Sequence, residues 1–93
     1  MTTKYRVERS AKFKRDFRKI RKRGYNTVEF DNVVHMLANG LPLPPKYHDH
    51  PLRGDRKGSR ECHITPDWLL VYRIYEDVLI LLLQETGTHS DLF

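Results

Sequence analysis

Histidines and cationic side chains gather in the stretch YHDHPLRGDRKGSRECH, which runs from Tyr47 to His63. It holds His48, His50 and His63, and it offers a core almost nothing apolar to bury. An imidazole has an ordinary pKa of about 6.5, so near neutral pH one ring can accept a proton while another donates one. The stretch therefore favours general acid–base chemistry, because a pure binding surface has no need for several groups that titrate near neutrality.

Two other uses of these side chains compete with proton transfer. His48 and His50, together with His63 and His89, would make a zinc-binding set, but no CxxC or HExxH spacing supports a metal site, and we expect neither metal nor cofactor. Cys62 lies next to His63, and neighbouring residues of a strand point to opposite faces. If His63 faces solvent, Cys62 packs inward, and we expect it to be a core thiol and not a nucleophile.

Length and composition limit the class of protein. The 93 residues suffice for one small domain, so residues 1–93 are expected to form a single unit with its site on the surface of one core. The longest apolar run, Val78 to Leu83, is far short of the roughly 20 residues that a bilayer requires, so we expect no membrane association. The N-terminus MTTKYRVERS does not resemble a signal peptide, and the single cysteine cannot form an internal disulfide. Both features favour the cytoplasm.

Positive charge is concentrated at the start of the chain. Eleven of the 17 Lys and Arg residues lie within the first 25 positions, against only Glu8 and Asp16, so the net charge of +5 conceals an acidic remainder. Such a basic helix is either an ordinary solvated face or a surface that neutralises phosphates and releases counterions. An acidic protein partner would fit the same surface.

Periodicity and turn residues predict the elements that position these groups. The segment Asn26-Thr-Val-Glu29 resembles a capping box, and Glu76-Asp77 indicates a tight turn. The predicted elements are a strand at 4–9, a helix capped by Ser10 that stops at Gly24, a second helix between Asn26 and Gly40, a proline-rich connector at 41–47, and strands at 60–64, 68–75 and 78–84.

This order, β-α-α-β-β-β, predicts an α+β fold in which a helical hairpin packs on one face of a small, mostly antiparallel sheet. The runs WLLVY and VLILLL are typical of central strands covered on at least one face. We expect His63 and Asp67 to project from the open face, beside the histidines of the preceding loop. The C-terminal ETGTHSDLF follows the last strand, so it can bring His89 and Phe93 back along the same face.

Four motifs in this order, LPLPPKY, YHDHPLRG, CHITPDWLLVYRI and ETGTHSDLF, closely resemble the YafQ toxins of the RelE/ParE superfamily. The resemblance covers the chain from the helical hairpin to Phe93. It implies a cytoplasmic toxin that an acidic DinJ- or RelB-like antitoxin sequesters, as a heterotetramer of two toxins and two antitoxins that meets DNA only through the antitoxin. When free, such toxins enter the ribosomal A site and cleave messenger RNA, so we expect the helix from Ser10 to Lys22 to contact ribosomal RNA phosphates or the antitoxin.

The resemblance also implies a site. Metal-free RNA cleavage needs a base for the ribose 2′-OH, an acid for the leaving 5′-oxygen and a cation or donor for the charge that develops at phosphorus. Asp67 would orient a histidine or act as the base, and Phe93 would stack on a base of the RNA. The implied catalytic residues are His50, His63, Asp67, His89 and Phe93, with Trp68 beside them as core, site wall or substrate contact.

The chain departs from the family at Glu85, where the resemblance leads us to expect an arginine. A carboxylate cannot stabilise a phosphate, so Glu85 is either a bystander next to the substrate or a working carboxylate. We therefore assign the phosphate contacts to the cations of the loop and the strand that follows it, which are Arg53, Arg56, Lys57 and Arg60.

A second class of function fits the same fold. A non-catalytic, ParE-like inhibitor of a topoisomerase, or a basic protein-binding module, would use the charged helix and have no use for the histidines. Because the chain has several histidines on segments that the fold brings together, the sequence favours the endoribonuclease.

Overall fold

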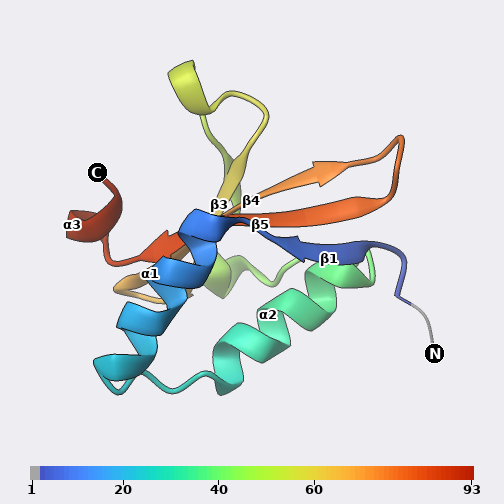
Figure 1. Ribbon diagram of the computed structural model, residues 1–93. Coiled ribbons are helices and arrows are strands. Elements are labelled where there is room, and N and C mark those ends of the chain that lie inside the picture. The colour runs from blue at the N-terminus through green and yellow to red at the C-terminus, as the bar shows by residue number, and fades with distance from the viewer. Residues whose placement is uncertain (1–2) are drawn as a thin grey trace.

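The computed structural model describes residues 3–93 as two long helices, a five-stranded sheet and a short C-terminal helix (Figure 1). No helix in this range is long and apolar enough to cross a membrane. The elements in chain order are β1 (Arg6–Arg9), α1 (Ala11–Lys22), α2 (Val28–Ala38), the 3-10 turn η1 (Pro45–Tyr47), β2 (His50–Pro51), the 3-10 turn η2 (Gly54–Arg56), β3 (Arg60–Thr65), β4 (Trp68–Tyr75), β5 (Ile80–Gly87) and α3 (His89–Leu92).

The sheet has the strand order β1-β5-β4-β3-β2. β1 is parallel to β5, and every other pair is antiparallel. The predicted α+β class is therefore confirmed, with the helical hairpin of α1 and α2 on one side of the sheet and the η2 loop rising from the other (Figure 1). The prediction missed the two smallest elements, β2 and α3.

The first helix begins as predicted, whereas the second does not. The Ser10 hydroxyl accepts a hydrogen bond from the Phe13 backbone N–H at 2.9 Å, which satisfies an otherwise unpaired donor of the first turn. The capping box predicted from Asn26 to Glu29 is wrong. Asn26 Oδ1 accepts from the Val28 N–H at 2.9 Å, but Glu29 instead accepts from the Tyr47 hydroxyl at 2.6 Å. Glu29 thus fastens η1 to α2.

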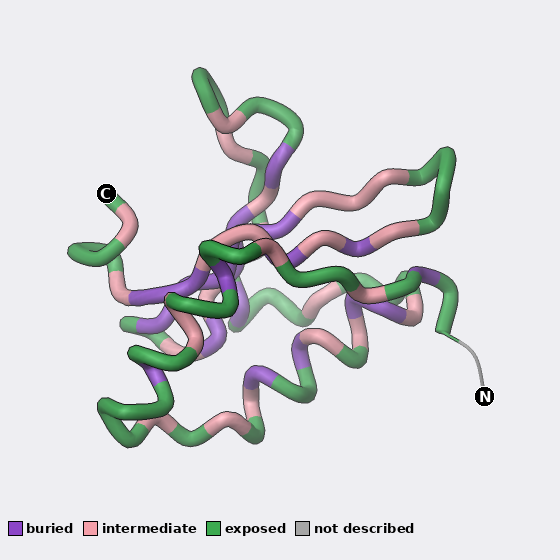
Figure 2. Tube along the Cα trace, viewed as in Figure 1, coloured by how far each residue is buried: buried purple, intermediate pink, exposed green. Residues whose placement is uncertain are grey.

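The central strand β4 is buried on both faces (Figure 2). Trp68, Leu70 and Tyr72 point toward the helices and join one core cluster with residues of α1, α2 and β5. Leu69 and Val71 point the other way and are also buried, which explains the unbroken apolar run WLLVY. β4 is therefore a rigid support for any residue held beside it.

The turn between β4 and β5 is longer than predicted. β5 begins at Ile80 and not at Val78, and it continues to Gly87. Leu79 has a positive φ of 54°, which few residues other than glycine adopt, and Val78 and Leu79 are exposed at the tip. The apolar run at 78–83 is thus partly turn, because its first residues bury no side chain.

Candidate active site

β3 separates His63 from Cys62 as the alternation of a strand requires. Cys62 is 0% exposed in the core, whereas His63 is half-exposed on the face away from the helices. Burial in apolar surroundings raises the pKa of the Cys62 thiol far above its ordinary value. Because a thiolate is the nucleophilic form, the prediction of an inert core thiol is confirmed.

Three histidines meet at the β2–β3 edge. The rings of His48 and His63 lie 5.4 Å apart and nearly edge-to-face. His48 has a left-handed backbone, with φ of 48°, which turns the chain from η1 into β2. His50 then lies directly opposite Glu61 in the β2–β3 pair. The loop therefore brings His48 to His63, as predicted, and places His50 beside Glu61 on the neighbouring position of the same strand pair.

Both ring nitrogens of His50 face acceptor oxygens. Nδ1 lies 2.7 Å from the His48 carbonyl oxygen, and Nε2 lies 3.4 Å from Glu61 Oε1. A neutral imidazole has only one N–H, so only the doubly protonated ring can donate to both oxygens. His50 is thus held between a backbone carbonyl and the carboxylate of Glu61.

Glu61 is a functional candidate that the sequence reasoning missed. It is only 7% exposed, and its Oε2 has no hydrogen-bond partner within residues 3–93. Buried acceptors are normally satisfied, so this oxygen is available to accept a hydrogen bond from a bound ligand or from water. The signal was present in the sequence, because Glu61 is two residues from His63 on the same strand and so shares its face.

A second group of side chains surrounds the C-terminal helix α3. The Arg56 guanidinium forms an ion pair with Glu85, lies 4.9 Å from the centre of the Phe93 ring, and donates to the Leu92 carbonyl at 3.4 Å. The rings of His89 and Phe93 are 5.2 Å apart, and Phe93 is 56% exposed. Arg56 thereby connects the η2 loop to the end of the chain.

Glu85 lies between two cations. Besides Arg56, its Oε1 is 3.2 Å from Lys12 Nζ, and Lys12 also contacts Asp16 at 2.9 Å. Glu85 itself is 17% exposed. Its charge is therefore matched within the protein, which removes the repulsion that an unpaired carboxylate would exert on a phosphate.

α3 is held in place by its own first turn and by α1. Thr88 and Asp91 form a reciprocal capping box, and Arg23 at the end of α1 forms an ion pair with Asp91 at 2.7 Å. Hydrogen bonds from Arg23 and from the Thr88 backbone hold the pKa of Asp91 well below its ordinary range. His89 and Phe93 are thus fixed by contacts that the sequence motif alone does not reveal.

The two groups flank the middle of the open face. Glu61 lies beside Val71, which lies beside Glu85, and His63 lies beside Leu69, which lies beside Gly87. Neighbouring strands are about 4.8 Å apart, so the backbones of β3 and β5 are separated by about 10 Å with β4 between them. A ligand lying over β4 would have the histidine group on one side and the Arg56 group on the other.

Asp67 is directed elsewhere. It lies in the β3–β4 turn, where it accepts hydrogen bonds from the Tyr25 hydroxyl at 2.9 Å and from Thr65 Oγ1 at 3.0 Å. The Tyr25 bond in particular lowers the pKa of Asp67, which makes it a weaker base. Within residues 3–93 the structure joins Asp67 to the helical hairpin and not to a histidine, so the expected orienting contact is absent.

Two residues assigned to the substrate lie on the wrong face. Trp68 is 0% exposed, and its Nε1 donates to Thr86 Oγ1 at 2.7 Å inside the core. Arg60 shares the face of Cys62, where it pairs with Asp49 at 2.9 Å. Trp68 is therefore a core residue, which was one of its expected roles, and the charge of Arg60 is paired with Asp49 ahead of β2. Arg53 and Lys57 are exposed on the η2 loop, as a phosphate contact requires.

Within the part of the chain that the structure describes, no group of three or more His, Cys, Asp or Glu side chains is arranged to hold a metal ion. His50 and His63 instead contact protein groups, and His89 lies against Phe93.

Comparison with known proteins decides the family. A family model described as a bacterial toxin of type II toxin-antitoxin system, YafQ, matches residues 5–93. The chain belongs to the YafQ toxin family. Among its relatives, the mRNA interferase toxin YafQ of Escherichia coli K12 is 38% identical over 88 residues, which is 94% of each chain.

Solved structures agree with this membership. The fold of this chain matches that of a chain in the crystal structure of the E. coli DinJ-YafQ complex, with a TM-score of 0.87 and 37% sequence identity. The match covers 96% of this chain and 98% of the solved one. A metal-bound toxin from Helicobacter pylori matches with a TM-score of 0.88 at 45% identity over the whole of both chains. The predicted resemblance to YafQ toxins and the predicted RelE-like fold are thus confirmed.

Proposed function

We propose that this chain is the toxin of a type II toxin-antitoxin pair and that it cleaves messenger RNA in the ribosomal A site, by general acid–base chemistry that its own side chains supply. The observation that carries the proposal is the pair of groups that flank β4. One side presents three histidines, and the other presents His89, Phe93 and Arg56. Proton transfer and RNA binding therefore have candidate residues within the span of three strands.

The reaction divides between the two sides. A neutral imidazole removes the proton from a ribose 2′-OH, the resulting oxygen attacks the adjacent phosphorus, and the bond from phosphorus to the 5′-oxygen breaks as a second, protonated imidazole donates to that oxygen. The products are a 2′,3′-cyclic phosphate and a free 5′-hydroxyl. We assign the two transfers to His63, which lies beside Leu69 of β4, and to His89, which follows Gly87 at the end of β5 on the other side of β4.

The remaining residues bind and stabilise. His50, whose two nitrogens face acceptors, acts as a cation near the phosphate, and Glu61 positions it. The exposed ring of Phe93 stacks on an RNA base, with Arg56 against the ring. Arg53 and Lys57 on the η2 loop attract the RNA backbone.

The partners follow from the family. The E. coli relative was solved as a DinJ-YafQ complex, so we propose that an acidic DinJ-like antitoxin sequesters this toxin in a heterotetramer. We place the free toxin in the cytoplasm, where its ribosomal substrate is found. A non-catalytic ParE-like binder remains the alternative, but it gives no role to the histidines.

Expression without the antitoxin tests the proposal. The protein should arrest translation, and co-expression of the acidic protein encoded beside its gene should restore growth. His63→Ala and His89→Ala should each relieve the arrest, whereas His35→Ala, an exposed histidine on α2, should not. Arrest that survives both site substitutions would favour the non-catalytic alternative.

A further inference from the structure

Arg73 is a cation of the open face of the sheet, and the candidate active site does not use it. It lies on β4, where its neighbours Tyr72 and Ile74 pack against the core on the helix side, so Arg73 points to the open face. It is four residues along β4 from Leu69, which lies beside His63, and this separation corresponds to about 13 Å. Arg73 is therefore too far from His63 to contact the phosphate that reacts there.

The guanidinium of Arg73 is held by the η2 loop and by an aromatic ring. A β-carbon on Gly58 would lie only 2.9 Å from Arg73 Cζ, so the loop backbone rests against the guanidinium and leaves room for glycine alone, with φ of +96°. The same Cζ lies 5.1 Å from the centre of the Tyr75 ring, a distance at which a cation and an aromatic face attract each other. The side chain is therefore positioned before any ligand binds.

The charge of Arg73 has no carboxylate partner within residues 3–93, although the side chain is half-buried. Two acidic residues near this end of β4 have other partners. Glu8 pairs with Arg6 at 3.2 Å. Glu76 accepts a hydrogen bond from the Tyr5 hydroxyl at 2.6 Å. A cation that is partly withdrawn from water and has no counter-ion favours an anionic ligand.

Tyr75 supplies a stacking surface next to this cation. It shares the open face with Arg73, is only partly buried, and lies outside the core cluster. The pair repeats the arrangement at the end of the chain, where the Arg56 guanidinium lies 4.9 Å from the centre of the Phe93 ring. An arginine beside an accessible aromatic ring suits single-stranded RNA, because the cation contacts a phosphate while the ring stacks on a base.

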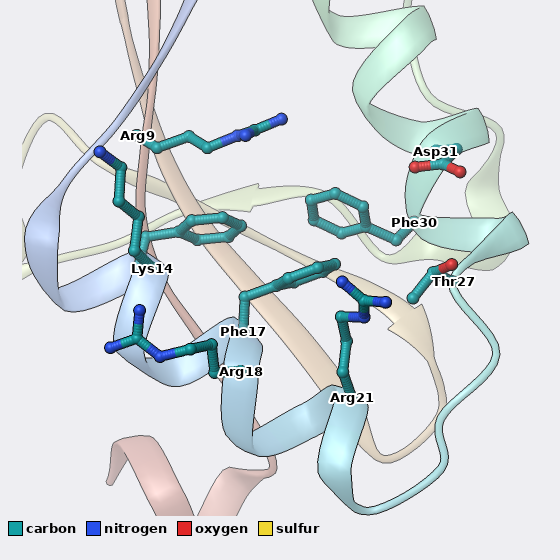
Figure 3. Close-up of a pocket in the computed structure, with 9 residues that line it drawn as sticks. Arg9, Lys14, Phe17, Arg18, Arg21, Thr27, Phe30 and Asp31 are labelled. Carbon is teal, nitrogen blue, oxygen red and sulfur yellow. The ribbon is translucent and has the colours of Figure 1, made fainter.

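The cations of α1 belong to a different surface. Arg18 and Arg21 project beside Phe17 at the hollow between the two helices, on the helix side of the sheet (Figure 3). An RNA strand that lies over β4 on the open face cannot reach them, because the sheet lies between. Arg73 is therefore a cation that continues the RNA surface along β4 itself.

We propose that Arg73 and Tyr75 form a second RNA subsite, which holds one nucleotide of the message outside the step that is cut. Arg73 contacts the phosphate of this nucleotide, and Tyr75 stacks on its base. The subsite fixes the message along β4 and so keeps the reacting phosphate between His63 and His89. The inference rests on the proposed cleavage of messenger RNA and extends it to residues that take no part in proton transfer.

Neutral linkages in the message test the contact with Arg73. Messages on purified ribosomes carry a single methylphosphonate, which has no negative charge, at one position at a time around the A-site codon. The measured quantity is cleavage efficiency, which is the saturating single-turnover rate divided by the half-saturating toxin concentration. In the wild type, one linkage other than the cut one should lower this efficiency by about tenfold, as expected for a hydrogen bond to a charged group. The same linkage should cost nothing further in Arg73→Gln, because the contact is already lost.

Further variants separate charge and stacking from structure. Arg73→Lys keeps the charge but not the planar group that rests on Gly58, so it should retain the sensitivity to that linkage, whereas mere support of the loop would make it as damaging as Arg73→Gln. Removal of the base from the same nucleotide should lower efficiency in the wild type and in Tyr75→Phe, but not further in Tyr75→Leu. Lys46→Gln is the matched control, since it removes an exposed cation 5.0 Å from another tyrosine ring, and it should cleave like the wild type.

The outcomes separate the subsite from the proposed function. If the wild type cuts the message but every neutral linkage outside the cut step costs the same in the wild type and in Arg73→Gln, the subsite is overturned and the endoribonuclease stands. A loss in Arg73→Gln that no linkage of the message reproduces would also overturn the subsite, by assigning Arg73 to ribosomal RNA or to the loop. An uncut message with the wild-type protein would overturn the proposed function and the subsite together.

Discussion

Substitution of Glu85 tests quantitatively whether this carboxylate acts as an ion-pair partner of Arg56 or as a general base. Its carboxylate pairs with Arg56 and Lys12, and the Arg56 and Glu85 side chains are 31% and 17% exposed. If Glu85 only holds Arg56 beside Phe93, Glu85→Gln should change cleavage little, because the amide still accepts a hydrogen bond and both cations remain. Removal of a general base would instead cost about 10²- to 10⁴-fold.

Arg56→Ala should be the damaging change. It removes the cation beside Phe93 and leaves Glu85 with Lys12 alone, so the carboxylate would repel the RNA phosphates. Exposed ion pairs contribute about 0–1 kcal/mol, and breaking fully buried ones costs about 3–5 kcal/mol. For this half-buried pair we expect a coupling of about 1–3 kcal/mol, so adding Glu85→Gln should recover roughly fivefold to 150-fold of the activity that Arg56→Ala loses.

The assay is single-turnover cleavage of a message held on purified ribosomes, with the two single variants and the double variant in one cycle. Glu8→Gln, an exposed carboxylate on β1, serves as the matched control for loss of one negative charge. A loss of about 10²-fold or more in Glu85→Gln would identify Glu85 as a base and refute this reasoning. Strictly additive losses in the double variant would show that the ion pair has no part in catalysis.

Three further predictions concern residues that position the catalytic groups. Glu61→Gln keeps the size of the buried side chain but removes the carboxylate that faces His50, so the pH–rate profile of cleavage should shift, whereas a purely structural role would lower stability and leave the profile unchanged. Arg23→Gln should loosen α3 and lower cleavage by misplacing Phe93, without unfolding the sheet. The pKa of Asp91 is lowered in the folded protein, so its ionised carboxylate stabilises the fold. This contribution to the free energy of unfolding is fully present above the ordinary carboxyl pKa of about 4 and is lost as the pH falls further. Acid unfolding followed by fluorescence should show this loss in the wild type and not in Asp91→Asn.

The elements that the sequence predicted are those with long periodic patterns. α1 shows its apolar stripe, and β4 shows a continuous apolar run between recognisable turns. β2 and α3 have two and four residues, and they form because the β3 edge and the end of β5 hold them, so local pattern could not indicate them. The Asn26 capping box failed because Glu29 found a partner in η1.

The site was predictable where strand alternation decides, and not where distant segments meet. Alternation gave the opposite directions of His63 and Cys62, and the same rule applied to Arg60 and Glu61 would have placed Arg60 with the core and Glu61 with His63. The pairing of Arg56 with Glu85 joins residues 29 positions apart in sequence, so only the folded chain reveals it. Of the roles left open for Trp68, the structure supports the core, where its Nε1 donates to Thr86 Oγ1.

The most direct measurement of the central claim is cleavage of a ribosome-bound message by the purified toxin and by its His63→Ala and His89→Ala variants, with 5′-ends mapped. The wild type should cut the message within the A-site codon and leave a 5′-hydroxyl on the downstream fragment. Each substitution should slow cleavage by about 10²-fold or more, as expected when a proton-transfer group is lost. Wild-type rates in both variants, or an uncut message with the wild-type protein, would contradict the assignment of RNA cleavage to the face beside β4.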